Sequence, residues 1–156
     1  MNRVARIIVM SLSLVLTLAA AHPIRLEAKT EAPKVIEYSG DEAVCETEMA
    51  HLDSYAIQVQ NKPKYTAYVI VYGGRYGTAR HEMRQRRSRI KRYLVKNRGI
   101  EPERVRVING GFREKVTVEL WLVEYGGKFP QPTMTISPAD VKYKRTKFQF
   151  NCSSFY

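Results

Sequence analysis

Apolar residues recur through the middle of the chain with two spacings, one typical of helices and one typical of strands. The helical spacing begins at Cys45. Its apolar positions fall at i, i+4 and i+7 of a helical turn: Cys45, Met49, Leu52, Ala56 and Val59. Proline cannot continue a helix interior, so we expect this helix to end before Pro63 in "NKPK".

A second helix is predicted over residues 80–98. Its apolar positions are Met83, Ile90 and Leu94, which leaves a narrow apolar seam on a largely charged helix. Gly99 follows directly, and glycine is the residue that most often ends a helix. We therefore expect this helix to stop at Gly99.

Four shorter segments have the composition of strands: Val35–Tyr38, Tyr65–Tyr72, Val105–Ile108 and Val116–Tyr125. The second, "YTAYVIVY", is apolar on both alternations, which favours a central strand covered on both faces. The order of elements is then (β)αβαββ. This order predicts an α+β fold, a two-layer sandwich with a mixed sheet and helices on one face.

Residues 1–21 have the pattern of a secretory signal peptide. Two arginines precede an uncharged apolar run, and Ala19 and Ala21 supply small residues at the cleavage site. A second cut after Ala28 stays open, as does an uncleaved anchor, although the run is shorter than the ~20 residues of a membrane span. We expect a periplasmic or secreted protein with no transmembrane segment after cleavage.

The remaining chain divides into three parts by composition. Residues 22–34 are polar and contain prolines, which predicts a disordered leader. Residues 35–127 hold the helices and strands of one domain. Residues 128–156 are predicted as a linker, "GGKFPQPTMTISP" with its neighbours, and a basic C-terminal edge strand within "DVKYKRTKFQFNC".

Cys45 and Cys152 are the two cysteines of the chain. In an exported protein an even count predicts a disulfide. The bridge would tether the C-terminal strand to the start of the first helix, with a stabilisation on the order of 4–5 kcal/mol for such a long loop. Two free thiols are the alternative. No other cluster of cysteine and histidine suggests a metal site.

Basic residues outnumber acidic ones by 26 to 15, for a formal net charge of +11. Nine of the basic residues lie in the second predicted helix: Arg80, Arg84, Arg86, Arg87, Arg89, Lys91, Arg92, Lys96 and Arg98. On a helix, positions 84, 87, 91 and 98 lie close together in angle, and positions 85, 89, 92 and 96 form a neighbouring row. Two interpretations stay open, a solvated face and a surface that binds a polyanion. Export argues against nucleic acid as the partner.

The stretch "VYGGRYGTAR", residues 71–80, places glycines between a strand and the basic helix. It matches neither the phosphate loop of nucleotide-binding proteins nor the dinucleotide loop. Gly73, Gly74 and Gly77 therefore indicate either tight-turn positions with positive φ or a loop in which Arg75 seeks an anion.

The sequence offers no catalytic constellation and no sign of a cofactor. The three histidines, His22, His51 and His81, are isolated, and "HEM" lacks the second histidine of a zinc-protease helix. Trp121 on the last strand predicts a core residue, with stacking on a glycan ring as the alternative. We expect a protein that is not an enzyme.

The middle of the chain resembles the OmpA-like, peptidoglycan-associating domain family. The likeness rests on "HLDSYAIQVQNKPKYTAYVIVYGG", on "RRSRIKRYLVKNRGIEPERVRVINGGF" and on "EKVTVELWLV". These stretches are similar to the family's first helix and strand, its arginine-rich second helix with the following turn, and its closing strand. The resemblance implies the same (β)αβαββ topology.

In that family an aspartate in a "T-D-x-x-G" loop and an arginine in "L-S-x-x-R-A-x-x-V" bind the diaminopimelate of the wall peptide. Arg86 aligns with the arginine, whereas "GRYG" stands in place of the aspartate loop. The resemblance thus implies a divergent member that lacks the loop aspartate. Arg86 is the one ligand-binding residue that the resemblance carries over, and Arg75 or Tyr76 stands in the region of the missing aspartate. With the loop glycines, the candidate ligand-binding residues are Arg86, Arg75, Tyr76, Gly73 and Gly74.

Together these features predict an exported, non-enzymatic OmpA-like binding module. It would associate with the cell envelope, through peptidoglycan or another anionic polymer. The contact surface would be the glycine and arginine loop and the arginine-rich helix. The alternative is a domain that binds a polyanion or a partner protein by charge alone, with no affinity for peptidoglycan.

Overall fold

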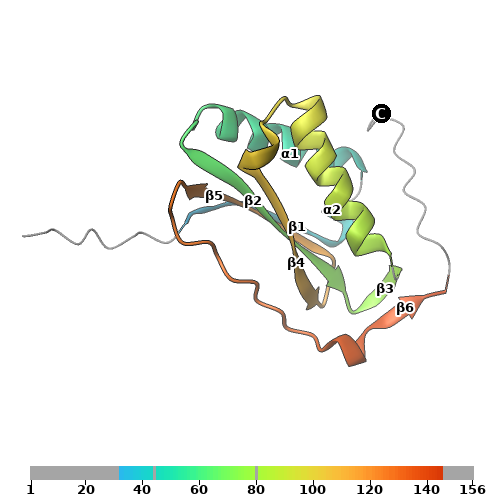
Figure 1. The fold of residues 1–156 in the computed structure, drawn as a ribbon. Helices are drawn as coiled ribbons and strands as arrows, with labels where there is room; N and C mark the ends of the chain where they lie inside the picture. Colours follow the sequence, from blue (N-terminus) through green and yellow to red (C-terminus); the bar gives the residue numbers. More distant parts are fainter. Residues whose placement is uncertain (1–31, 44, 80, 146–156) are drawn as a thin grey trace, which may run out of the picture.

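The computed structural model describes residues 32–43, 45–79 and 81–145. Over these residues the chain forms a four-stranded sheet with two long helices, α1 and α2, on one face (Figure 1). A second, two-stranded sheet lies at one end. The predicted α+β class, with a mixed sheet in a two-layer arrangement, is confirmed.

The long elements follow the predicted order with one strand added between the helices. The strands and helices are β1 (Lys34–Ser39), α1 (Cys45–Gln60), β2 (Tyr65–Gly74), β3 (Tyr76–Ala79), α2 (Glu82–Arg92), β4 (Val105–Arg113), β5 (Thr117–Glu124) and β6 (Lys142–Lys144). Short helical turns are η1 (Gly40–Ala43), η2 (Tyr93–Asn97), η3 (Pro102–Arg104) and η4 (Pro138–Asp140).

The main sheet has the strand order β1-β5-β2-β4. Strand β2 pairs parallel with β4 and antiparallel with β5, and β1 pairs antiparallel with β5. Every β2 residue from Thr66 to Gly74 is buried. The prediction that this strand is central and covered on both faces is therefore confirmed, and β4 forms one edge of the sheet.

Both predicted helix ends are confirmed. Helix α1 ends at Gln60, before Pro63. Helix α2 passes into the π-helical turn η2, where the Arg98 N–H donates to the Tyr93 carbonyl oxygen. Gly99 then adopts a φ of +68°, a left-handed conformation that glycine reaches without a steric penalty. The chain can therefore leave the helix and turn toward β4.

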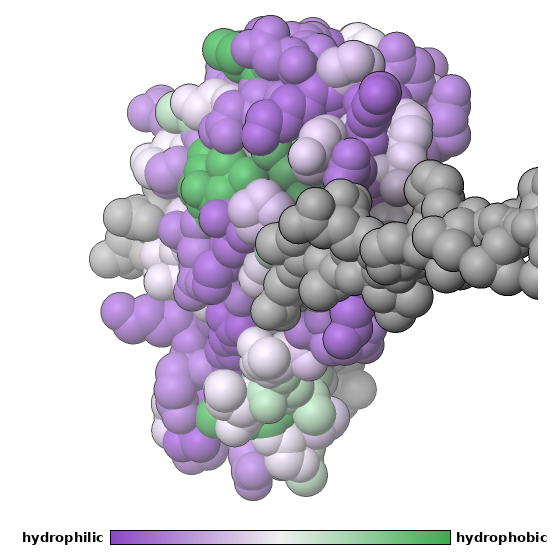
Figure 2. Space-filling view, turned by 90° about the vertical axis from the view of Figure 1, so that its left-hand side faces the viewer, coloured by the Kyte–Doolittle hydropathy of each residue, from purple (hydrophilic) through white to green (hydrophobic). Residues whose placement is uncertain are grey.

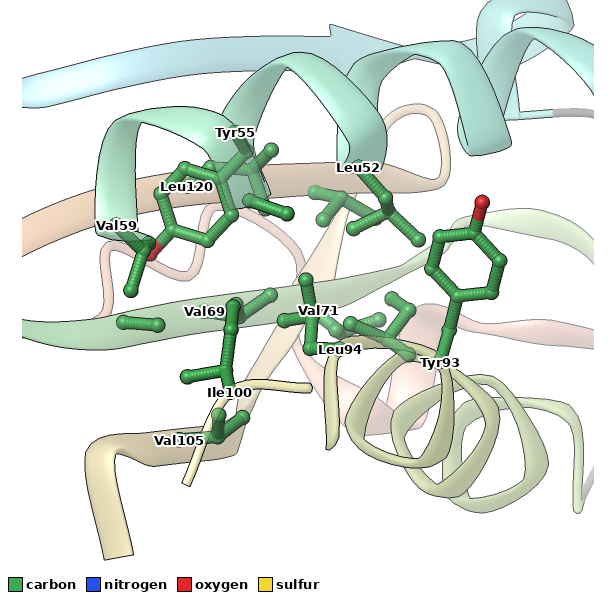
Figure 3. Packing of buried hydrophobic residues seen from close by; sticks show 14 of the residues in the cluster. Leu52, Tyr55, Val59, Val69, Val71, Tyr93, Leu94, Ile100, Val105 and Leu120 are labelled. Atoms are coloured by element: carbon green, nitrogen blue, oxygen red, sulfur yellow. The ribbon is translucent and has the colours of Figure 1, made fainter. Parts of the chain in front are cut away.

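The principal core lies between the helices and the sheet (Figure 3). Its side chains include Leu52, Tyr55, Val59, Val69, Val71, Leu94 and Leu120. Tyr55, which the predicted apolar stripe did not include, is fully buried and donates its hydroxyl to the Trp121 carbonyl oxygen. A tyrosine can occupy this core because its hydroxyl finds a partner at the sheet.

The opposite face of the sheet is covered by the segment predicted as a linker. Phe129 packs on Tyr68 with ring centroids 4.9 Å apart, and the Thr133 N–H donates to the Tyr72 hydroxyl at 3.1 Å. Ile136 is buried and bridges to Phe112. This segment covers the apolar side chains of β2 and β5 on the face opposite the helices. In Figure 1 it is the orange chain that runs along that face after β5.

The predicted leader and C-terminal strand are described only in part. Ala32 is buried and the Pro33 carbonyl accepts a hydrogen bond from Leu122, so the last leader residues pack against the domain. Strand β6, three residues long, pairs parallel with β3 through Tyr76–Lys142 and Ala79–Lys144. The signal peptide, most of the leader and the chain after residue 145 lie outside the described residues. No helix among the described residues is long and apolar enough to cross a membrane.

The predicted disulfide stays a prediction. Cys45 begins α1 at a half-buried position, as expected. Cys152 lies outside the described residues.

Candidate anion-binding groove

Helix α2 carries two buried arginines on the side that faces α1. Arg86 is 4% exposed and Arg89 6% exposed. The Nη1 of Arg86 donates to Oε1 of Glu48 at 2.8 Å and to the Ala43 carbonyl at 2.9 Å, and its Nη2 lies 3.6 Å from Oε1 of Glu82. The Nη2 of Arg89 pairs with the second oxygen of Glu48. One buried carboxylate thus joins two guanidinium groups.

We call Tyr38, Glu48, Glu82, Arg86 and Arg89 the inner charge cluster. The hydroxyl of Tyr38 donates to Oε1 of Glu48 at 3.3 Å. Burial, followed by the negative charge of Glu48, raises the pKa of Tyr38 well above its ordinary value. Burial also lowers the pKa of Arg89, against the opposing effect of Glu48. Two carboxylates face two guanidinium groups, so the formal charges of the cluster cancel.

This pairing changes the role expected for Arg86. The resemblance suggested that it binds a ligand carboxylate, but in the structure Glu48 and Glu82 already occupy its charged end. A ligand would have to replace these internal partners and leave Glu48 with a single arginine, Arg89. The geometry therefore assigns Arg86 to the packing of α2 against α1, where it is closed to solvent.

The glycines of the candidate loop belong to a strand. Gly73 and Gly74 are buried residues of β2 and neither has a positive φ, so the turn prediction for these two is wrong. A Cβ at Gly73 would lie 2.7 Å from the ring of Phe112, and one at Gly74 would lie 3.0 Å from the Val116 nitrogen. Close packing requires glycine at both positions. Gly77, with a φ of +74°, does occupy a turn-like conformation.

Arg75 and Tyr76 lie where β2 passes into β3. The Nη2 of Arg75 is 3.2 Å from Oε1 of Glu114, and its backbone carbonyl accepts a hydrogen bond from Lys142. Tyr76 is 60% exposed, with the Nζ of Lys142 5.6 Å from its ring centroid. Both residues thus contact Lys142 of β6 and help to hold β6 beside β3. Of the two, only Tyr76 has a largely exposed side chain.

A different set of basic residues forms an open site. Two adjoining pockets between α2 and β4 are both lined by Arg84 and Arg87, and Lys91 lines one of them, on the outer side of α2. The pockets have volumes of about 200 and 230 Å³ and share Arg84 and Arg87. We call this hollow the α2–β4 groove. Among the described residues that line it there is no carboxylate.

The two halves of the groove differ in character. The half nearer the start of α2 is lined by Thr78, Ala79, Met83, Asn109, Phe112 and Tyr143 together with the two shared arginines. The other half adds Ser88, Lys91 and Val107. One half thus places two aromatic rings beside a guanidinium pair, and the other places Lys91 beside the same pair.

Sequence reasoning found part of this groove. Of the four positions predicted to share a helix face, 84, 87 and 91 line it. Arg98 lies after η2 and pairs with Asp53. Asn109, Phe112 and Tyr143 were missed because they come from β4 and β6, distant in sequence from α2. Glu48 was also missed, although a carboxylate within an otherwise apolar helix face is the signal that marked it.

Other kinds of site find no support in the part of the chain that the structure describes. No group of three or more His, Cys, Asp and Glu residues is placed to hold a metal ion there. On the side shown in Figure 2 the surface is mostly hydrophilic, with a compact hydrophobic area in its upper half.

A scan against models of protein families finds no match to the chain, and a search of curated proteins finds none with significant similarity. The likeness to the OmpA-like family therefore stays a proposal.

Proposed function

We propose that this protein is an exported, non-enzymatic binding module of the cell envelope that holds an anionic polymer in the α2–β4 groove. One observation carries the proposal. Arg84, Arg87 and Lys91 line the groove, and none of them makes an ion pair with a described residue. Three unneutralised cations in one hollow attract an anionic group.

The chemistry of the groove fits carboxylate and phosphate groups. A guanidinium presents a planar fork of donors that matches either group, whereas Lys91 adds a point charge. The groove continues past the shared arginines to Lys91 along α2. A repeating polymer with one negative charge per unit could therefore bind along it.

The envelope assignment rests on the predicted signal peptide and the OmpA-like likeness. Peptidoglycan is the polymer that the likeness favours, and its wall peptides carry carboxylates. The (β)αβαββ order and the arginine-rich helix that crosses one face of the sheet support this proposal. The resemblance selected Arg86 as the arginine that contacts the ligand. In this proposal the ligand contacts Arg84 and Arg87 instead, because Arg86 is buried and paired with Glu48.

The alternative function, binding of a polyanion or a partner protein by charge alone, is favoured by a separate observation. Exposed lysines outside the groove, such as Lys64, Lys96 and Lys128, add to the surplus that gives the chain its +11 charge. If only total charge mattered, these lysines would contribute as much to binding as the groove residues do.

The test is co-sedimentation of the purified mature protein with isolated peptidoglycan sacculi at physiological salt. The groove variant is Arg84→Gln/Arg87→Gln/Lys91→Gln, and the matched control is Lys64→Gln/Lys96→Gln/Lys128→Gln, which loses the same charge. A hydrogen bond to a charged group contributes about 1.5–3 kcal/mol, so the groove variant should bind at least ~10-fold more weakly. The control should bind nearly as well as the wild type.

Equal weakening of both variants would favour binding by charge alone. Retention of the groove variant at wild-type strength would exclude the groove as the contact surface. A wild-type protein that does not sediment with sacculi would exclude peptidoglycan as its ligand.

A further inference from the structure

We infer that the aromatic end of the α2–β4 groove is a subsite for a single anionic sugar unit, a sugar ring that carries a carboxylate or a phosphate. The inference rests on the proposed function and names the ligand class of the same groove. It is carried by the juxtaposition of Phe112, Tyr143 and Asn109 with Arg84 and Arg87 in one pocket.

The size of the pocket limits its occupant. Its volume of about 200 Å³ lies below the range of about 300–1,000 Å³ that is typical of sites for drug-sized ligands. One ring with a short substituent fits such a volume, and a larger ligand would have to extend toward Lys91. The site therefore suits one unit of a polymer.

Two aromatic rings form a corner in this pocket. Phe112 and Tyr143 meet edge to face, with centroids 6.2 Å apart and planes 85° apart. Tyr143 is 38% exposed and lines the pocket beside Phe112. The face of an aromatic ring carries negative charge density, which attracts the slightly positive C–H groups on one face of a sugar ring.

Polar groups are placed for the rest of such a unit. The Oδ1 of exposed Asn109 accepts a hydrogen bond from the Gly111 N–H at 3.3 Å, which leaves the amide NH₂ able to donate to a sugar hydroxyl. Arg84 and Arg87 line the same pocket and the next one. They supply forked donors for a carboxylate or phosphate on the ring.

Single-stranded nucleic acid is the other ligand that combines aromatic contacts with cations. Proteins that bind it usually present several aromatic side chains, on which successive bases stack along the groove. Here both aromatic residues lie in one half of the groove, and the other half is lined by Ser88, Lys91 and Val107 with the arginines. An aromatic corner at one end favours one ring and not a series of bases.

The experiment measures dissociation constants for the mature protein by titration with four probes. Short oligoglucuronate and a hexose monophosphate carry a sugar ring with a carboxylate or a phosphate, and their relative affinities separate these two sources. Oligoglutamate of matched charge has no sugar ring, and oligothymidylate tests nucleic acid. The variants are Tyr143→Leu, which keeps an apolar side chain without the aromatic face, and Asn109→Ala, which removes the amide at an exposed position.

At least one anionic sugar should bind more tightly than oligoglutamate. Tyr143→Leu should weaken that binding about five- to tenfold, as expected for the loss of an aromatic contact, and should leave oligoglutamate binding unchanged. Asn109→Ala should weaken sugar binding by a smaller factor. Circular dichroism of both variants should match the wild type.

Equal affinity for oligoglutamate and both sugars would overturn the sugar subsite, while the anion-binding function would stand. Tighter binding of oligothymidylate than of either sugar would overturn the inference in favour of nucleic acid. Absence of binding to every probe would overturn it too, and the sacculus experiment would then decide separately on the proposed function.

Discussion

The inner and outer sides of helix α2 use the same residue types in opposite ways. Arg86 and Arg89 face α1, where they are buried and paired with Glu48. Arg84 and Arg87 face the groove, where no described carboxylate neutralises them. Arg86 and Arg87 are adjacent in the chain, so a rotation of about 100° along the helix separates a structural arginine from a ligand-binding candidate.

The difference teaches that an arginine-rich helix has to be interpreted one side chain at a time. A buried charge needs a partner because desolvation costs several kcal/mol per ion. An exposed charge is solvated and adds little to folding, but it remains available to a ligand. On α2 both kinds of arginine come from one basic stretch: Arg86 and Arg89 are buried and paired, and Arg84 and Arg87 line the groove.

Removal of the shared carboxylate should produce the largest effect. Glu48→Ala leaves two buried guanidinium groups without their common partner, and breaking a buried pair in this way costs about 3–5 kcal/mol. The measurement is the free energy of unfolding from urea denaturation. The control, Glu46→Gln, changes an exposed carboxylate in the same helix turn and should cost less than about 1 kcal/mol.

A companion variant guards against a protein too unstable to measure. Glu48→Leu/Glu82→Gln/Arg86→Met/Arg89→Met removes all four buried charges of the cluster and should be more stable than Glu48→Ala, because no unpaired ion remains. If Glu48→Ala were as stable as Glu46→Gln, the inner charge cluster would have no structural role.

A loss of folding stability of intermediate size is expected at alkaline pH. The pKa of Tyr38 is raised by burial in the folded protein, while an unfolded tyrosine titrates near pH ~10. Above that pH the unfolded chain releases the proton and the folded chain retains it, so stability falls as pH rises. At about pH 11 this residue should cost about 1.4 kcal/mol relative to neutral pH.

The comparison uses Tyr38→Phe, which lacks the titrating group. Unfolding free energies at about pH 8 and pH 11 should fall by ~1.4 kcal/mol more in the wild type than in the variant. Buried Tyr55, whose pKa is also raised by burial, contributes equally to both proteins and cancels. An identical fall in both proteins would contradict the prediction.

Substitution of the groove residues on the outer side of α2 should have the smallest effect on the free energy of unfolding. Arg84→Gln/Arg87→Gln/Lys91→Gln removes exposed or half-buried charges that have no described ion-pair partner, so its unfolding free energy should stay within about 0.5 kcal/mol of the wild type. Thermal and urea denaturation measure this value. A loss above about 1 kcal/mol would show that these residues hold α2 in place, and the contrast between the two sides would fail.

Much of the fold could be predicted because its signals are local. Pro63 and Gly99 mark helix ends through backbone chemistry that does not depend on distant residues. The composition of Tyr65–Tyr72 identified a central strand, since only burial on both faces suits such a run. Strand β3 was missed, since a four-residue segment with one glycine has no clear pattern and depends on pairing with distant β6.

The candidate site was predicted less well, because its properties depend on contacts between distant segments. Gly73 and Gly74 were interpreted as loop residues, yet the ring of Phe112 and the backbone at Val116 make them buried strand positions. Arg86 was selected by a likeness in local motif. Its availability depended on Glu48, 38 residues earlier in the chain, a partner that no local pattern could reveal.

The sequence by itself determined the α+β fold class, the order of the long helices and strands, and the cationic character of the chain. Propensity, periodicity and charge are properties of neighbouring residues. Only the tertiary structure decided which arginines are neutralised and which stay open. That division follows from the packing of α1 against α2, which encloses Arg86 and Arg89 with Glu48 and leaves Arg84 and Arg87 beside β4. Burial and pairing are set by three-dimensional proximity, so the same residue type has two roles on one helix.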